Sequence, residues 1–381
     1  MELIRGTHNL RAKHRGCVLT IGNFDGVHLG HQAVLQQVCA KAKALGVPAA
    51  VMTFEPQPQE LFQPEKAPAR LTNWREKYLA LRDQGVDRHI VIEFNKKFAS
   101  QPAREFIEKT LVDKLGVKFL VVGDDFRFGF KREGDFELLT KAGKELGFEV
   151  VDTRSYRQQQ QRVSSTAIRQ ALNEGDFENA EAMLGRPYQM QGKVVHGRKN
   201  GRTIGFPTAN IPLKRLKSPL HGVFAVTVTL GTAENSSCNR DERSEVANSC
   251  REAANSRAEG PNSRCAATNS RAEGTKSRCA ATNSLGEAEN NRTEGANNRA
   301  EGTYQAVANL GTRPTLNGDE VQLEVHLFDF SGNLYGQHVT VTPVAKLRAE
   351  QRFASLDQLK QQIQKDAARA KQLLAQHTAE S

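Results

Sequence analysis

The chain has 381 residues, of which 38% are hydrophobic, and a formal net charge of +10 at pH 7. This length suits two domains, and the lack of an apolar run of about 18 residues argues against a membrane-spanning helix. The charge fits either nucleic-acid binding or the handling of small polyanions such as nucleotides. The N-terminus lacks the apolar core of a signal peptide, and none of the six cysteines forms a CxxC pair. We therefore expect a cytoplasmic protein without a zinc site or disulfide framework.

Residues 17–172 alternate between short apolar runs and amphipathic stretches. Strands are expected at 17–24, 47–54, 88–94 and 118–123, with helices at 31–45, 74–85 and 103–115. This β-α alternation predicts an α/β domain, with a parallel sheet covered by helices on both faces. A short helix at 176–184 would close the unit, and Gly185-Arg186-Pro187 interrupts the pattern. We place the domain boundary there, which gives a first domain of residues 1–185.

The second domain, residues 186–381, has a different pattern. From Tyr188 onward, short β-rich runs alternate with Gly, Pro and Asn, which predicts a small all-β barrel or sandwich. The chain finishes with an amphipathic helix over about 355–376, whose expected apolar side carries Leu356, Leu359, Ile363 and Leu373.

A polar tract at about 232–303 interrupts this second domain. It contains near-copies, because NSRAEG occurs at 255–260 and again at 269–274. Its apolar residues are almost all Ala, so the tract cannot bury enough surface to offset the entropy of ordering it. The same lack of large repeated apolar positions argues against a solenoid. We expect a disordered low-complexity expansion of a β-hairpin loop, which costs little extra closure entropy.

The segment GNFDGVHLGH, residues 22–31, follows an expected strand and opens an expected helix. Backbone N–H groups and the helix dipole favour phosphate binding at such a position. Gly22, Gly26 and Gly30 would let the backbone approach a ligand closely. His28 and His31, three residues apart, can share one face of the first turn and stabilise charge on a nucleotide phosphate.

A second phosphate-binding candidate is VSSTAIRQAL at 163–172. Ser164 or Ser165 would cap a helix that carries Thr166 and Arg169 in its first turns. Hydroxyl groups and a guanidinium at a helix N-terminus can hold phosphate, although plain capping explains the serines equally well. Neither a Walker A sequence nor GxGxxG is present, which excludes those phosphate-binding schemes.

The pair HxGH and SSTxxR resembles the nucleotidylyltransferase superfamily. The longer strings GNFDGVHLGH, TFEPQP, LTNWREKYLAL and VVGDDFRFG resemble the FMN adenylyltransferase domain of prokaryotic bifunctional flavin-synthesis enzymes. The resemblance implies a Rossmann-like fold, catalysis by His28, His31 and Arg169, and a flavin region shaped by Asp124, Phe126 and Arg127. The ATP-binding set that it implies is Gly22, Asn23, Asp25, Gly26, His28, His31, Ser165, Thr166 and Arg169. Many relatives carry PHP where this chain has Gln57 between two prolines.

The segment GRKNGRTIGFPTAN at 197–210 is rich in Gly and basic residues, which suits phosphate contacts. Thr208 and Asn210, two residues apart, would place two oxygen ligands on the same side of an extended chain, as Mg²⁺ bound with ATP requires. Glu324 alternates with Leu323 and Val325. It would therefore face either solvent or, at a barrel mouth, a hydroxyl group that it deprotonates.

The strings GRTIGFPTAN, GVFAVTV, NLGTRPT, LEVHLFDF and LYGQ, in that order, are similar to the riboflavin kinase family. The resemblance implies a six-stranded barrel followed by a C-terminal helix. It also implies ATP at Gly201, Gly205 and Thr208, Mg²⁺ at Thr208 and Asn210, Glu324 as the catalytic base, and Arg348 near the flavin. Relatives join the corresponding strands by a short link, so the tract at 232–303 is a departure.

Together the resemblances predict an enzyme that phosphorylates riboflavin to FMN and adenylylates FMN to FAD, using ATP and Mg²⁺. Its expected partners are these small molecules, with no nucleic acid or membrane, and its oligomeric state stays open. One alternative is a nucleotidylyltransferase that acts on a pantetheine, nicotinate or glycerol phosphate. Another is a basic nucleic-acid-binding or flavin-binding protein without catalysis, although one Trp and five Tyr offer few stacking platforms.

Overall fold

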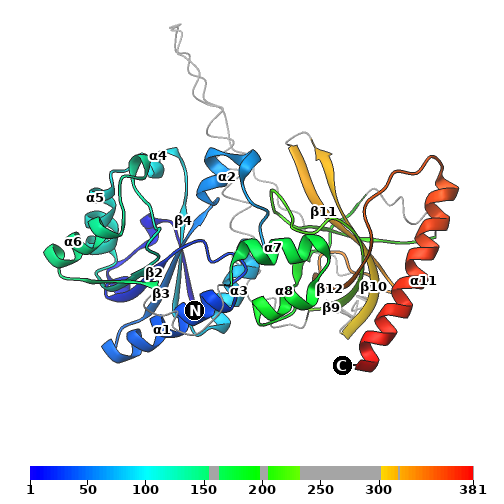
Figure 1. Ribbon diagram of the computed structural model, residues 1–381, viewed down its shortest axis with the longest axis horizontal. Helices are drawn as coiled ribbons and strands as arrows, with labels where there is room; N and C mark the ends of the chain where they lie inside the picture. The colour runs from blue at the N-terminus through cyan, green and yellow to red at the C-terminus, as the bar shows by residue number, and fades with distance from the viewer. Residues whose placement is uncertain (154–162, 198–204, 232–301, 316–317, 381) are drawn as a thin grey trace, which may run out of the picture. The chain divides into compact units, whose positions relative to one another are not determined.

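A computed structural model describes residues 1–153, 163–197, 205–231, 302–315 and 318–380 (Figure 1). The expected expansion at 232–303 lies outside these ranges except for its last two residues, and Gly201 lies outside them as well. Within the described ranges, no helix is long and apolar enough to cross a membrane.

The first domain contains a sheet of six parallel strands in the order β1-β4-β3-β2-β5-β6. Strand β2 lies between β3 and β5: the chain runs from β2 to β3 and β4 on one side, and then crosses to β5 and β6 on the other side. The carboxyl end of such a strand is a topological switch point, where open α/β sheets bind their ligands. The strands are β1 (Glu2–Arg5), β2 (Cys17–Ile21), β3 (Ala49–Glu55), β4 (Arg88–Glu93), β5 (Val117–Val122) and β6 (Glu149–Asp152).

Helices cover both faces of this sheet, as the sequence predicts. Alternate strand residues point to opposite faces. Val18 and Val51 pack under α1 (Leu29–Leu45) and α3 (Trp74–Asp83). Leu19 and Met52 belong to the opposite core, with η4 (Phe106–Lys114) and α6 (Phe136–Leu146). The shorter helices are α2 (Pro58–Phe62), α4 (Lys96–Ala99), α5 (Ala103–Glu105), α7 (Ser165–Glu174) and α8 (Phe177–Leu184).

The helix expected at 103–115 is not a single regular α-helix. Its first turn is α5, and η4 continues from it with π-helical hydrogen bonding. A periodicity of apolar residues does not distinguish these two kinds of helix over so short a stretch, because both keep Phe106, Ile107 and Leu111 on the buried side.

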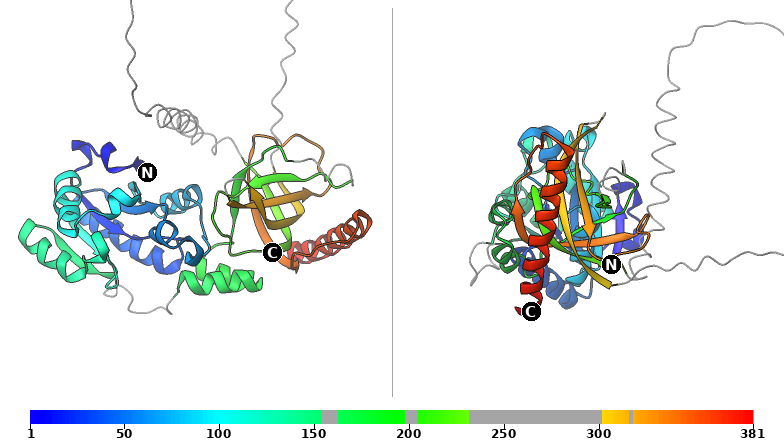
Figure 2. Two further views of the ribbon diagram at one scale, coloured as in Figure 1. Left: turned by 90° about the horizontal axis from the view of Figure 1, so that it is seen from above. Right: turned by 90° about the vertical axis from the view of Figure 1, so that its right-hand side faces the viewer.

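The second domain is a nearly closed antiparallel barrel with strand order β7-β12-β9-β10-β11-β8 (Figure 2). A bridge between Val195 and Asn210 links its two edges. Phe224, Val226 and Leu323 are fully buried residues of its strands. The strands are β7 (Met190–Lys193), β8 (Ala209–Pro212), β9 (Gly222–Leu230), β10 (Gly302–Thr315), β11 (Gly318–Leu327) and β12 (His338–Arg348).

Strands β9 and β10 are neighbours, and Leu230 pairs with Gly302 at the end of their ladder. The tract that the sequence predicts as a loop expansion therefore runs between two paired strands. Gly302 and Thr303, at the end of the approximate predicted range, belong to β10.

Helix α11 (Leu356–Glu380) packs on the outside of the barrel (Figure 2). Its residues Ala370 and Leu374 share a core cluster with Val223 and Ala225. The predicted apolar side is partly wrong, because Leu356 is 70% exposed. The first buried position of α11 is Asp366, whereas Leu359 and Ile363 before it are half-buried.

Candidate functional site

The loop after β2 has an unusual backbone. Phe24, Gly26 and Val27 have φ angles of 45°, 83° and 43°. Only Gly adopts such angles without strain, so the two other residues need support from their surroundings. A Cβ at Gly26 would also lie 2.8 Å from Leu71 Cδ1. This strained loop leads directly into His28.

The Asp25 carboxylate connects this loop to neighbouring segments of the chain. It accepts hydrogen bonds from the Leu71 N–H, the Thr72 N–H and the Thr72 hydroxyl at 3.0–3.1 Å, and it pairs with Arg169 Nη2 at 2.7 Å. Burial alone would raise the pKa of Asp25. The charges of Lys77 and Arg169, together with the backbone donors, hold it below its usual range instead. The Asp25 carboxylate is therefore ionised, and its oxygens are already bonded to protein groups.

His28 is the N-cap of α1 and accepts a hydrogen bond from the His31 N–H at 3.3 Å. The two imidazole rings stack with centroids 3.7 Å apart. The prediction that these histidines share one face of the first turn is thus confirmed. Both rings lie at a helix N-terminus, where the dipole and the first N–H groups favour an anion.

The two predicted phosphate-binding segments meet at this loop. Ser164 caps α7 by accepting from the Ala167 N–H at 3.2 Å, and Ser165 Oγ donates to the Asp25 carbonyl at 3.3 Å. Arg169 Nε donates to the Ala69 carbonyl at 2.6 Å. Two helix N-termini, α1 and α7, therefore converge beside the switch point. Asn23 and Thr166 are exposed in the same two segments.

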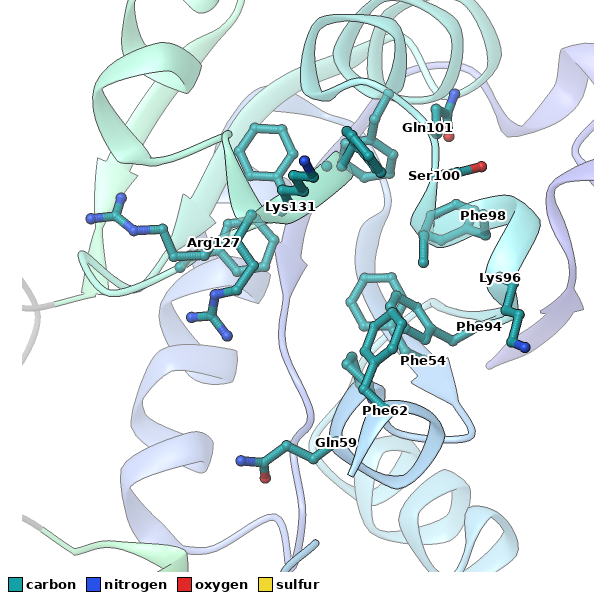
Figure 3. Close-up of a pocket in the computed structure, with 18 of the residues that line it drawn as sticks. Phe54, Gln59, Phe62, Phe94, Lys96, Phe98, Ser100, Gln101, Arg127 and Lys131 are labelled. Carbon is teal, nitrogen blue, oxygen red and sulfur yellow. The ribbon is translucent and has the colours of Figure 1, made fainter. Parts of the chain in front are cut away.

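A cavity of about 520 Å³ opens between the chain segments that follow β3, β4 and β5 (Figure 3). In Figure 3, Phe62, Phe94 and Phe98 gather on one side of the hollow and Arg127 lies on the other. An apolar, aromatic cavity with charged groups at its rim suits a flat ring system that carries an anion. Eight phenylalanines and four basic residues line it: Phe54, Phe62, Phe94, Phe98, Phe106, Phe126, Phe128, Phe130, Lys96, Arg127, Lys131 and Arg132.

The sequence predicts only two residues of this cavity, Phe126 and Arg127. Asp124, the third residue of the predicted flavin region, is exposed and does not line it. The missed signal is the recurrence of Phe just after the expected strands. A count of Trp and Tyr alone overlooks it.

Gln57 follows β3 and is 4% exposed. Its backbone N–H donates to Glu60 Oε2 at 2.9 Å. Its side-chain Nε2 is buried and has no hydrogen-bond partner among the described residues. The structure thus shows a buried amide at position 57, and any role for that position stays untested.

In the barrel, Asn210 of β8 lies directly opposite Glu324 of β11. Directly paired residues of an antiparallel ladder share one face. Leu323 and Val325 are fully buried on the other face, whereas Glu324 is partly exposed, which confirms the predicted alternation. Its second neighbour on this face, Asn309 of β10, extends the polar row.

Thr208 precedes β8, and its carbonyl accepts from Asn210 Nδ2 at 3.5 Å. Asn210 Oδ1 accepts from Gln322 Nε2 at 2.9 Å and retains a second lone pair. Within the described ranges, His, Cys, Asp and Glu form no group of three that could hold a metal. Gly205 is exposed with a φ of 84°, next to the segment that contains Gly201 and lies outside the described ranges.

Arg348 lies apart from Glu324. The two share a cross-strand row through Asn309 and Val223, but three strand spacings of about 4.8 Å separate them, roughly 14 Å. Arg348 Nε donates to Asp366 of α11 at 2.9 Å. The predicted base and the predicted flavin contact therefore occupy two ends of one outer face.

Comparisons with known proteins agree with this division. The sequence model of FAD synthetase matches residues 10–167, and that of riboflavin kinase matches residues 184–374. The bifunctional riboflavin kinase/FMN adenylyltransferase of Escherichia coli K12 is 44% identical, over 98% of this chain and 97% of its own length. The Haemophilus influenzae protein of the same description is also 44% identical, over 97% of this chain and 98% of its own length.

A solved structure extends the likeness to the fold. A crystal structure described as a macrolide-efflux protein from Streptococcus pneumoniae is 26% identical, with a TM-score of 0.62 over 97% of this chain and 99% of that one. The activity in that description is a statement about the streptococcal protein. On the two family models and the near-complete coverage of its relatives, this chain belongs to the family of bifunctional riboflavin kinase/FMN adenylyltransferases.

Proposed function

We propose that this chain makes FAD in two ATP-dependent steps, each in its own domain. The barrel phosphorylates riboflavin to FMN, and the α/β domain adenylylates FMN and releases pyrophosphate. The family relationship supports both activities. The observation that carries the site assignment is the meeting of the α1 and α7 N-termini beside a phenylalanine-lined cavity, at the switch point of the first sheet.

In the adenylyl-transfer step, the cavity holds the isoalloxazine ring of FMN. Its basic rim residues, among them Arg127 and Lys131, attract the FMN phosphate. That phosphate is already anionic, so it attacks the α-phosphorus of ATP without a protein base. His28 and His31 stabilise the charge that develops on the departing pyrophosphate, and Arg169 joins them from α7.

Asp25 serves this step indirectly. A carboxylate repels phosphate, and the Asp25 oxygens already accept hydrogen bonds from Leu71, Thr72 and Arg169. We therefore assign Asp25 to the support of the ATP loop and of Arg169 rather than to direct contact with ATP.

In the kinase step, Glu324 accepts the proton of the terminal ribityl hydroxyl, whose oxygen then attacks the γ-phosphorus of ATP. Thr208 and Asn210 offer a hydroxyl and an amide oxygen, the hard donors that Mg²⁺ prefers when phosphates and water complete its coordination. A bound Mg²⁺ would neutralise phosphate charge in this step. Arg348, at the far end of the same face, would lie near the flavin ring. The cytoplasmic location stays a prediction from the cysteine pattern.

Reciprocal variants test the two assignments. We expect His28→Asn to lower kcat for FAD formation from FMN by about 10²–10³-fold, because Asn still caps α1 but lacks the imidazole. FMN formation from riboflavin should stay at the wild-type rate. Glu324→Gln should lower FMN formation by about 10²–10⁴-fold and leave FAD formation from supplied FMN unchanged. Parallel loss of both activities in either variant would contradict two separate sites.

A further inference from the structure

The loop between β2 and α1 has a second support, from a residue that the sequence assigns to the other domain. Arg186 Nη2 donates to the Gly26 carbonyl at 2.6 Å, and Arg186 Nη1 donates to the Val27 carbonyl at 3.1 Å. Arg186 Nη1 also reaches the Leu184 carbonyl at 3.4 Å, at the C-terminus of α8. One planar guanidinium thus joins the end of α8 to two consecutive carbonyls of the strained loop.

Gln32, in the first turns of α1, acts on the same groups. Its Nε2 donates to the Val27 carbonyl at 3.0 Å and to the Leu184 carbonyl at 2.9 Å. With the Asp25 contacts already described, the polar backbone groups of this loop are fixed from several directions. The Gly26 N–H donates to Thr72 Oγ1 at 3.1 Å.

The arrangement matters because the loop does not hold its own shape. The positive φ angles of Phe24 and Val27 persist only where the surroundings over-determine them. Val27 directly precedes His28, so a relaxation at Val27 would rotate the start of α1 and with it the stacked imidazoles.

We propose that Arg186 is a positioning residue for adenylyl transfer, which sets the His28 and His31 rings by holding the Gly26 and Val27 carbonyls. Arg186 lies within residues 184–374, the range that matches riboflavin kinase, and beyond residues 10–167, the range that matches FAD synthetase. The adenylyltransferase loop therefore depends on a side chain from outside its own family match.

Charge and surroundings agree with this role. Burial lowers the pKa of the Arg186 guanidinium, and the carboxylates of Asp83 and Glu76 raise it. Arginine stays charged at neutral pH in either case. A cation beside the Leu184 carbonyl also interacts favourably with the C-terminal end of α8.

The test compares Arg186→Met with the wild-type full chain. We expect kcat for FAD formation to fall by about 10²-fold, because small misplacements of catalytic groups have effects of that size. KM for FMN should stay within about twofold, since the cavity lining does not include the loop or its Arg186 partners. FMN formation from riboflavin by the same variant should be unchanged, which reports that the chain is folded.

Further variants separate the positioning role of Arg186 from the effect of its side-chain volume. Arg186→Lys keeps a donor for one carbonyl and should recover about tenfold of the lost kcat. Gln32→Met should lower kcat less than Arg186→Met, and the double variant should be non-additive because both residues hold Val27. The matched control is Arg82→Met, since Arg82 is 52% exposed on α3 and pairs only with its neighbour Asp83 in the described structure.

The inference rests on the adenylyl transfer proposed above, and the two fail differently. A wild-type chain that makes no FAD from FMN would remove the proposed function itself. A wild-type chain that makes FAD, with an Arg186→Met variant that is equally fast, would overturn the inference alone. Equal loss of both activities in Arg186→Met, with a lowered unfolding midpoint, would also overturn it, because Arg186 would then act on stability.

Discussion

At the scale of single residues, we expect His89 to make the first domain sensitive to acid. It is 1% exposed in β4, and its Nε2 lies 2.9 Å from Thr53 Oγ1 of β3. Burial lowers the pKa of His89 to about 3, and the charges of Lys77 and Arg5 act in the same direction. The folded protein thus keeps this imidazole neutral at a pH where the unfolded chain, with a pKa near 6.5, binds a proton.

The sign of the pH effect follows from this difference. The contribution of His89 to stability is complete above about pH 6.5 and is lost as the pH falls towards 3. Between pH 7 and pH 4.5, we expect the free energy of unfolding of His89→Gln, which cannot take up the proton, to fall by about 2–3 kcal/mol less than that of the wild type. Urea unfolding followed by the fluorescence of Trp74, the single tryptophan, measures this. Parallel pH curves for the two proteins would refute the assignment.

The sequence brings the proposed nucleotide-binding residues together because they are contiguous. His28, His31 and Asn23 belong to one strand-to-helix turn, and Ser165 and Arg169 to one helix start, so spacing along the chain already places them. The cavity was mostly missed because its rings come from the ends of three strands. The contacts of the Asp25 carboxylate with Thr72 and Arg169 could not be predicted, because they join segments far apart in the sequence.

At the scale of elements, α11 contributes a small apolar contact to the barrel. Leu374 is 1% exposed and Ala370 is fully buried, and they pack against β9 and β10. The ion pair of Arg348 with Asp366 joins the same helix to β12. Periodicity predicts the helix but not its buried end, because the position of a helix along a sheet is decided by packing.

The measured cost of removing this contact should differ along the helix. We expect Leu374→Ala to destabilise the barrel by about 2–5 kcal/mol, and Leu356→Ala, at an exposed position, to change it by less than about 0.5 kcal/mol. The loss of kinase activity with increasing urea follows the barrel, whereas Trp74 fluorescence follows the first domain. Equal midpoints for the two variants would contradict the packing of α11.

At the scale of the whole molecule, two domains with different chemistry share one chain. The parallel sheet could be predicted from the pattern of apolar residues, because the β-α alternation repeats several times. The same kind of pattern left a barrel or a sandwich open for the second domain, and the family resemblance favoured the barrel. The support of one domain's loop by Arg186 could not be predicted, since it depends on contacts between residues 159 or more apart in sequence. The domain boundary at Gly185 stays a prediction.

The tract between β9 and β10 should leave both activities intact. It begins after Leu230 and returns at Gly302, and it is separated in sequence from Asn210 and Glu324. Lengthening a hairpin loop adds little closure entropy, and each doubling costs only about 0.6 kcal/mol. Because the tract lies between two barrel strands, its effect has to be tested on the kinase step.

The most direct measurement of the central claim is chromatographic product analysis of the purified chain. The protein would be incubated with ATP, Mg²⁺ and riboflavin, and in parallel with FMN as the starting flavin. We predict FMN followed by FAD from riboflavin, and FAD from FMN. The absence of FAD in both reactions would contradict the account, and FAD from FMN without any FMN from riboflavin would contradict the kinase site at Asn210 and Glu324.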